Sequence, residues 1–251
     1  MKKLIIFLFL LILIDGKVTN SELTGKEIVK KADQVLHPDY AIYAADMITI
    51  KQNGEKKLFQ LKIYVSGKDH ALVWYLSPPR ERGTGYLLDD NNMWMYFPSV
   101  ERSVRISSSQ TIMGTDFSTA DILKVRLAED YDAILLSMEE LDGIPVYSLE
   151  LKAKSNNAAY NEIKYWIKKD GFIPIKMEFY TISGKLLKIL TYSEVKNIGG
   201  RTRPIKLTME SMINVGYKSI MSLTTADYET KIPDYFFTQE YLDRGLKSEE
   251  N

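Results

Sequence analysis

The feature that most constrains the fold of this chain is an alternation of apolar and polar residues that begins near Tyr40 and recurs as far as residue 229. Successive side chains of a strand point to opposite faces of a sheet, so a period of two is typical of strands. Turn signals such as Asp170-Gly171 and Ser183-Gly184 separate the segments, which predicts an antiparallel meander. We place its strands at residues 41–51, 58–66, 70–76, 85–90, 92–98, 101–107, 144–153, 160–169, 173–182, 185–197, 203–214 and 218–229.

Two segments with helical spacing lie outside this pattern. Thr24 to Glu27 fits a capping box at the start of a helix over residues 25–37, and His37-Pro38 ends that helix. A Ser-x-x-acid cap at Ser118 precedes a second, shorter helix at 118–126. Because strand twist accumulates, a single sheet of this length has to curl. The concave face then receives the two helices, so the sequence predicts a cavity beneath a helical lid.

The N-terminus has the pattern of a secretory signal. Lys2 and Lys3 precede an unbroken apolar run at residues 4–14. The run is short for a membrane span, which needs roughly 20 apolar residues. We therefore expect a signal peptide at 1–20, a mature chain that begins between about residue 17 and residue 22, and one domain over 21–251. An uncleaved N-terminal anchor is the alternative.

The composition excludes several kinds of chemistry. The 33 basic residues balance the 33 acidic ones, which argues against a nucleic-acid partner. The absence of cysteine excludes disulfides and thiolate catalysis. His37 and His70 have no sequence neighbour at metal-ligand spacing, and Asp89-Asp90 lies in a turn, where Asp is favoured for local backbone bonding. We expect no catalytic residue, no metal and no cofactor, and we therefore expect that the protein is not an enzyme.

Aromatic and Met side chains give the strongest candidate for a binding surface. Leu72, Trp74 and Leu76 share one face of their predicted strand. The strand at 92–98 is apolar on both faces, so it is either an ordinary core strand or the wall of a cavity. Met suits a cavity wall because its thioether adapts to variable apolar ligands. The residues alone leave both readings open.

Three sequence blocks carry a resemblance to a known family. Residues 92–100 read NMWMYFPSV, residues 105–110 read RISSSQ and residues 113–118 read MGTDFS. These blocks resemble the LolA-like outer-membrane lipoprotein-sorting family, whose members have a Trp-Tyr-Pro strand, a Ser-rich turn and a short lid helix. Tyr165-Trp166-Ile167 and the C-terminal Phe236-Phe237-Thr238 are similar to later parts of the family, so the match runs from about residue 24 to 240.

The resemblance implies a mainly β fold, in which a single curled antiparallel sheet forms an incomplete (half) β-barrel with a short helical lid over an apolar cavity. It also implies a monomeric periplasmic carrier of lipoprotein acyl chains or lipids, with an inner-membrane exporter as a further partner. An envelope sensor and an accessory lipid-binding subunit of such an exporter are the alternatives. The expected lining of the cavity is Ile28, Leu72, Trp74, Leu76, Trp94, Met95, Tyr96, Ile112, Met113, Phe117 and Ile122.

One departure from the family concerns how the lid is held. The well-studied carrier of the family has an arginine just before the third strand that holds the lid by hydrogen bonds, whereas the nearest counterpart in this chain is Lys68. A lysine is a point charge and lacks the planar fork of an arginine. The sequence therefore predicts that the lid is held in a different way.

Overall fold

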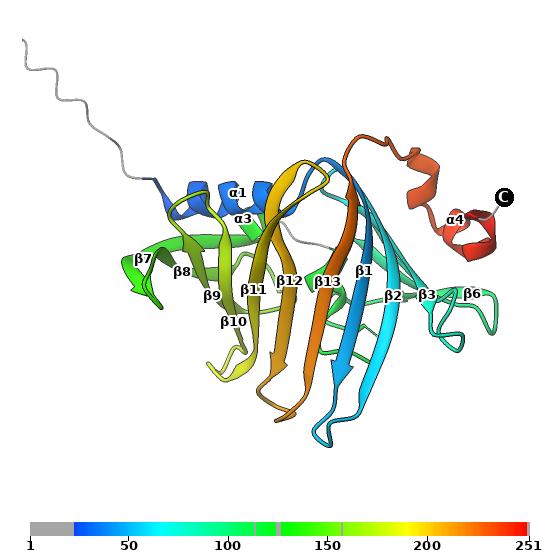
Figure 1. Cartoon of the computed structure of the whole chain (residues 1–251), viewed down its shortest axis with the longest axis horizontal. Coiled ribbons are helices and arrows are strands. Elements are labelled where there is room, and N and C mark those ends of the chain that lie inside the picture. Colours follow the sequence, from blue (N-terminus) through cyan, green and yellow to red (C-terminus); the bar gives the residue numbers. More distant parts are fainter. Residues whose placement is uncertain (1–22, 113, 124–126, 157, 250–251) are drawn as a thin grey trace, which may run out of the picture.

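A computed structural model describes residues 23–112, 114–123, 127–156 and 158–249. Its strands form one antiparallel sheet in the order β6-β5-β4-β3-β2-β1-β13-β12-β11-β10-β9-β8-β7 (Figure 1). The strands are β1 (Tyr40–Ile50), β2 (Lys56–Ser66), β3 (His70–Ser77), β4 (Gly85–Asp89), β5 (Asn92–Phe97), β6 (Arg102–Ile106), β7 (Tyr131–Leu141), β8 (Ile144–Ala153), β9 (Glu162–Lys168), β10 (Pro174–Tyr180), β11 (Leu186–Ile198), β12 (Arg201–Ser211) and β13 (Lys218–Asp227).

The sheet is a meander that is joined at its centre. β1 pairs with β2 on one side and with β13 on the other, so the first half of the chain runs outward to β6 and the second half runs back from β7. β6 and β7 are the two edges of the sheet, so the curled sheet does not close into a barrel. The predicted fold, a half-barrel built from one antiparallel sheet, is confirmed.

Three short helices lie on the concave face. They are α1 (Gly25–Leu36), α2 (Thr119–Leu123) and α3 (Leu127–Asp130). The predicted capping box is present at Thr24 and Glu27, and the helix ends at His37 as expected. The apolar stripe of α1, which includes Ile28, belongs to the same buried cluster as the inward side chains of the sheet. Residues 124–126 of the predicted lid helix lie outside the described residues.

The start of α1 touches β7 so closely that only glycine fits there. A Cβ atom at Gly25 would lie 2.5 Å from the carbonyl oxygen of Ala133. This contact fixes one end of α1 against the edge of the sheet. Helix and sheet then enclose the concave space from opposite sides (Figure 1).

The C-terminal segment covers the opposite, outer face of the sheet. This segment contains η1 (Asp234–Phe237), α4 (Gln239–Asp243) and η2 (Leu246–Glu249). We call its residues 232–246, which end at the first residue of η2, the C-terminal strap. The strap packs on the outer side chains of β3, β4 and β5 and forms a second buried cluster with them. The Asp243 carboxylate also accepts a hydrogen bond of 3.0 Å from the backbone N–H of Ser103 in β6. This part of the sheet is thus covered on both faces.

The sequence prediction missed one strand. β7 was not predicted, because its side chains do not alternate cleanly: Ile134, Leu136 and Met138 are exposed apolar residues, and the register shifts between Leu135 and Ser137. An edge strand makes ladder bonds on one side only, so it tolerates such an irregular pattern. Within the described ranges, no helix is both long and apolar enough to cross a membrane.

Candidate functional site

The lid of the concave face is the segment 108–112 and 114–123, called the lid segment below. An isolated antiparallel bridge between Thr111 and Ser118 folds it back on itself. Two backbone bonds of 2.8 Å support the fold, from Ile112 to Phe117 and from Thr119 to Gln110. The side chains of Ile112 and Phe117 are fully buried in the concave cluster. The lid segment is therefore a folded plug with its own hydrogen bonds, seated on apolar contacts.

A buried ion pair ties the lid segment to β11. Lys188 Nζ lies 2.5 Å from Asp121 Oδ2, and the two side chains are 10% and 4% exposed. Lys188 also donates to the backbone carbonyl of Asp116 at 3.0 Å, and its ammonium lies over the rings of Tyr160 and Phe179. A charge in this apolar setting is tolerated only with its partner in place. Lid closure and this ion pair therefore depend on each other.

Hydroxyl groups complete the polar cluster around Asp121. Tyr160 donates from its hydroxyl to Asp121 Oδ1 at 2.9 Å, and the Ser118 hydroxyl lies 2.9 Å from the same tyrosine oxygen. The backbone N–H of Ser118 donates to Asp121 Oδ2 at 2.7 Å. Burial raises the pKa of Tyr160 well above its usual value, so the phenol stays protonated as a donor.

A second contact joins the lid segment to β13. The backbone N–H of Asp116 donates to Ser219 Oγ at 2.9 Å, and that hydroxyl donates to Asp116 Oδ2 at 3.0 Å. Burial raises the pKa of Asp116, and the Ser219 hydrogen bond and the charge of Lys188 oppose this effect only in part. The lid is thus held at two strands by two polar contacts.

Two small cavities flank this polar cluster under the lid and helices. One has a volume of about 50 Å³ and the other of about 60 Å³, and Asp121 and Tyr192 border both. The walls of the first include Ile163, Met177, Phe179 and Leu190, which come from β9, β10 and β11. The walls of the second include Ile63, Val65, Ile122, Leu207, Met221 and Leu223. Both cavities are therefore mainly apolar, with Asp121 in the wall of each and the buried Arg203 in the wall of the second.

The structure places five of the predicted lining residues on the concave side. Ile28, Met95, Ile112 and Phe117 belong to the concave cluster, and Ile122 packs against that cluster and borders the second cavity. Met113 lies outside the described residues. Of the described residues in the prediction, only Ile122 borders either of these two cavities.

The other five predicted residues lie on the opposite, outer face of the sheet. Leu72, Trp74 and Tyr96 are buried under the C-terminal strap, and Leu76 and Trp94 pack against the same outer cluster. The inward side chains of these strands are their sequence neighbours, such as Val73, Tyr75 and Met93. The alternation of side chains between the two faces of β3 was predicted correctly. Because both faces are apolar, the sequence pattern does not indicate which face the strap covers.

The other residues that line the two cavities were missed, although the sequence holds a signal for some of them. Met177 with Phe179, and Leu190 with Tyr192, are pairs at the strand period of two. Lys188 falls on the same parity as Leu190 and Tyr192, which places a charge on an apolar face. Such a residue needs a buried counter-charge, and Asp121 supplies it.

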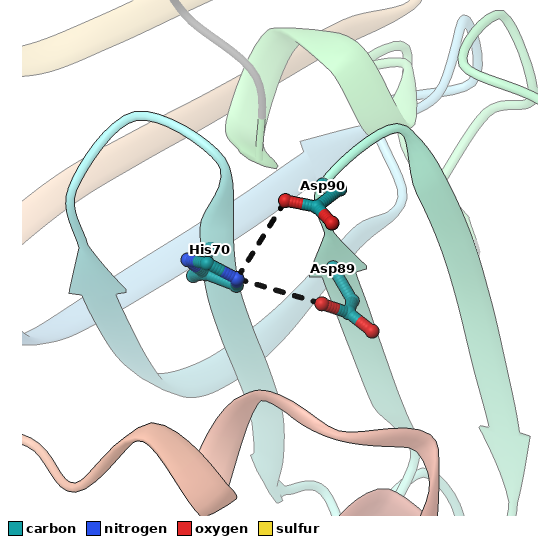
Figure 2. Close-up of side chains that lie close together, drawn as sticks. All are labelled: His70, Asp89 and Asp90. Carbon is teal, nitrogen blue, oxygen red and sulfur yellow. Dashed lines mark ion pairs between the residues drawn. The ribbon is translucent and has the colours of Figure 1, made fainter.

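A separate polar cluster lies at the start of β3. Antiparallel pairing sets His70 opposite Asp89, and Asp90 follows in the turn to β5. His70 Nε2 lies 3.5 Å from Asp89 Oδ1 and 4.0 Å from Asp90 Oδ1 (Figure 2). Sequence spacing did not reveal these partners of His70, because residues 19 and 20 positions away in sequence are brought to it by strand pairing.

Lys68 makes only exposed contacts. Its ammonium lies 3.4 Å from Glu129 of α3 and 3.8 Å from Asp69. Both Lys68 and Glu129 are about half exposed, so water and salt weaken the pair. The tie between lid and sheet is instead made by Lys188, which lies far from Lys68 in sequence.

Known proteins share this fold. A LolA superfamily protein from Nitrosomonas europaea is 28% identical, with a TM-score of 0.79 over 87% of this chain and 99% of that chain. A domain named for outer-membrane lipoprotein sorting, from Vibrio parahaemolyticus, is 25% identical, with a TM-score of 0.77 over 88% of this chain and 98% of that one. A DUF1329 family protein from Desulfovibrio piger is also 25% identical, with a TM-score of 0.79 over 87% and 97%.

At the level of sequence, the chain matches a family model. No curated protein sequence matches the chain. A family model described as "Uncharacterized protein" matches residues 67–244, which include most of the strap and most of the sheet. The chain therefore belongs to the family which that model describes, and it shares the fold of the LolA superfamily protein and of the lipoprotein-sorting domain.

Proposed function

We propose that this protein is a carrier that shields acyl chains of lipoproteins or lipids in its concave interior. The observation that carries the proposal is an apolar half-barrel whose lid segment is held by one buried ion pair, Lys188–Asp121, between two apolar cavities. The similarity to a domain named for lipoprotein sorting supports the same class of cargo. Catalysis has no part in this function.

The energetics explain why such a carrier is needed. Burial of one methylene is worth about 0.8 kcal/mol, so a chain of sixteen carbons represents on the order of 12 kcal/mol. This barrier keeps a lipidated molecule from crossing water unaided. A carrier removes the barrier if it covers the chain throughout the transfer, and its lid then has to release the chain at the end.

The described conformation is a closed one. Cavities of about 50 and 60 Å³ are well below the roughly 150 Å³ that accommodates a benzene molecule in an engineered protein core. An acyl chain is several times larger than benzene. Uptake therefore requires the lid segment to leave its seat, which breaks the Lys188–Asp121 and Asp116–Ser219 contacts and joins the two cavities.

The proposed place of action is the periplasm, on the way to the outer membrane. The signal pattern at residues 1–20 supports export, and N-terminal sequencing of the protein from its own cell envelope tests it. We expect the mature chain to begin between about residue 17 and residue 22. A sequence that starts at Met1 would contradict cleavage and would leave an N-terminal anchor.

An engineered disulfide tests the carrier proposal directly. The chain has no cysteine, so Asp116→Cys with Ser219→Cys introduces the only pair of thiols. These two side chains are already in contact, which favours a bond between lid segment and β13. We expect the oxidised variant to lose uptake of a fluorescent fatty acid, and reduction to restore it. Each single cysteine variant, treated with the same oxidant, is the control.

The same variant separates the carrier from its alternatives. A locked lid that leaves fatty-acid uptake unchanged would place the ligand elsewhere, and the protein would then be better described as a sensor or a scaffold. Native mass spectrometry of the wild-type protein from its own envelope identifies the cargo. Bound lipid or lipopeptide supports the carrier, whereas co-purification with an inner-membrane exporter alone supports an accessory subunit.

A further inference from the structure

We propose that His70, Asp89 and Asp90 form a binding site for a divalent transition-metal cation, of which Zn²⁺ is the best match. One ligand atom from each residue lies within 4.8 Å of the other two. Figure 2 shows the imidazole of His70 on β3 directed at the two carboxylates, which come from the end of β4 and the following turn. The site lies on the outer part of the sheet, away from the cavities under the lid.

Backbone structure, and not chance side-chain placement, brings the three ligands together. His70 and Asp89 are paired residues of the β3–β4 ladder. Asp90 has a φ of 54°, a left-handed conformation that turns the chain back toward β5. The ring of His70 also packs against Phe237 of the C-terminal strap, with 5.7 Å between centroids. The imidazole is thus oriented from the side opposite to solvent.

The distances suit a small metal ion. With metal–ligand bonds of about 2.1 Å in tetrahedral geometry, neighbouring ligand atoms lie about 3.4 Å apart. His70 Nε2 and Asp89 Oδ1 are 3.5 Å apart, which matches. Asp90 Oδ1 is 4.0 Å from the same nitrogen, and because its side chain is 74% exposed it can move inward without disturbing packing.

The charge balance of the cluster also favours a cation. Two carboxylates converge on one imidazole nitrogen, and within the described residues neither has a lysine or arginine nitrogen at ion-pair distance. The nearby ammonium of Lys68 is directed at Asp69 and Glu129. A divalent cation would neutralise the two carboxylates and bind the imidazole nitrogen at the same time.

The ligand types select the metal. Ca²⁺ and Mg²⁺ prefer oxygen ligands throughout, whereas imidazole with carboxylates suits Zn²⁺ and neighbouring transition metals. Three protein ligands leave at least one coordination position open to water or to an anionic group. An ion on this surface could therefore hold the phosphate or carboxylate of a second molecule, independently of the acyl cavity.

Calorimetric titration of the untagged, chelator-treated protein with Zn²⁺ tests the site. We expect one equivalent to bind with micromolar affinity, and no binding of Mg²⁺ or Ca²⁺ at the same concentrations. His70→Ala and the double variant Asp89→Asn with Asp90→Asn should each weaken Zn²⁺ binding at least about tenfold, the scale of losses at metal sites. The matched control is Asp142→Asn with Asp170→Asn, which removes two exposed turn carboxylates elsewhere.

Proton NMR supplies a readout that does not depend on heat. The chain has only two histidines, so the ring signals of His70 are identified by their loss in His70→Ala. Zn²⁺ should shift the signals of His70 and leave those of His37 in place. Absence of binding to the wild type up to about 1 mM, where the binding free energy is only about 4 kcal/mol, would overturn the proposal. Unchanged Zn²⁺ affinity in both site variants would do so too, and the cluster would then be an ion pair.

Discussion

Replacement of Lys188 by methionine removes the positive charge from the buried pair and keeps a side chain of similar length. Asp121 would then remain as an unpaired carboxylate with 4% of its side chain exposed. Loss of one partner of a buried pair typically costs about 3–5 kcal/mol. Tyr160 and the backbone N–H of Ser118 still donate to this carboxylate, so we expect the lower end, about 3 kcal/mol.

The cost falls on the closed lid, because an open lid returns Asp121 to water. A difference of about 3 kcal/mol corresponds to roughly a hundredfold change in the ratio of open to closed molecules. If uptake needs the open lid, a fluorescent fatty acid should bind Lys188→Met up to about a hundredfold more tightly. Stopped-flow and equilibrium fluorescence measure the rate and the affinity.

Two further variants make this result specific. Lys188→Met combined with Asp121→Asn removes both charges, so it should recover most of the closed state and give a coupling free energy of about 2 kcal/mol. Lys196→Met removes an exposed lysine of the same strand, whose pair with Glu194 is open to solvent, and should leave binding unchanged. Fatty-acid affinity that is equal in wild type and Lys188→Met would refute the role of the pair in closure.

Three other predictions concern the strap and the lid. Gly85→Ala would place a Cβ 2.4 Å from Trp74 and 2.8 Å from Leu242, so urea unfolding should show a loss of about 1–3 kcal/mol. Trp74→Ala should cost about 3–5 kcal/mol, whereas Trp74→Phe should cost much less because the indole N–H has no hydrogen-bond partner among the described residues. Fatty-acid affinity of the folded fraction should stay unchanged in both variants, since Trp74 faces the strap. Burial raises the pKa of Asp116, so its contribution to stability is full below the unfolded value and is lost as pH rises through the folded one. Asp116→Asn should therefore stabilise the protein at neutral pH and flatten its acid-side stability profile, as followed by thermal unfolding; an unchanged profile would contradict this.

The sequence predicts the sheet well because the physics of a strand is local. Turn dipeptides and the period of two mark each hairpin from a few neighbouring residues, as at Asp170-Gly171 between β9 and β10. The capping box at Thr24 is equally local. β7 was not predicted, because its pattern of apolar and polar side chains is set by its place at the edge of the sheet. That place depends on the path of the whole chain.

The candidate site could be predicted only in part, because faces are decided by distant segments. In β3, Leu72 and Trp74 lie on one face, Val73 and Tyr75 lie on the other, and all four side chains are apolar. The strap comes about 160 residues later and covers the first pair, which leaves the second pair to the concave side. Likewise, His70 gains Asp89 through strand register, and Lys188 gains Asp121 through lid closure.

The positions of strap and cavities also indicate which part of the protein moves. β3, β4 and β5 are packed on both faces, by the concave cluster and by the strap, so they form a rigid wall. The first cavity lies instead over β9, β10 and β11, whose outward side chains, such as Lys164 and Trp166, are not buried. Strands with only one packed face bend at lower cost than strands in a filled core. Under the carrier proposal, an acyl chain would therefore be accommodated by displacement of the lid segment together with outward bending of β9 to β11, while the wall under the strap keeps its shape.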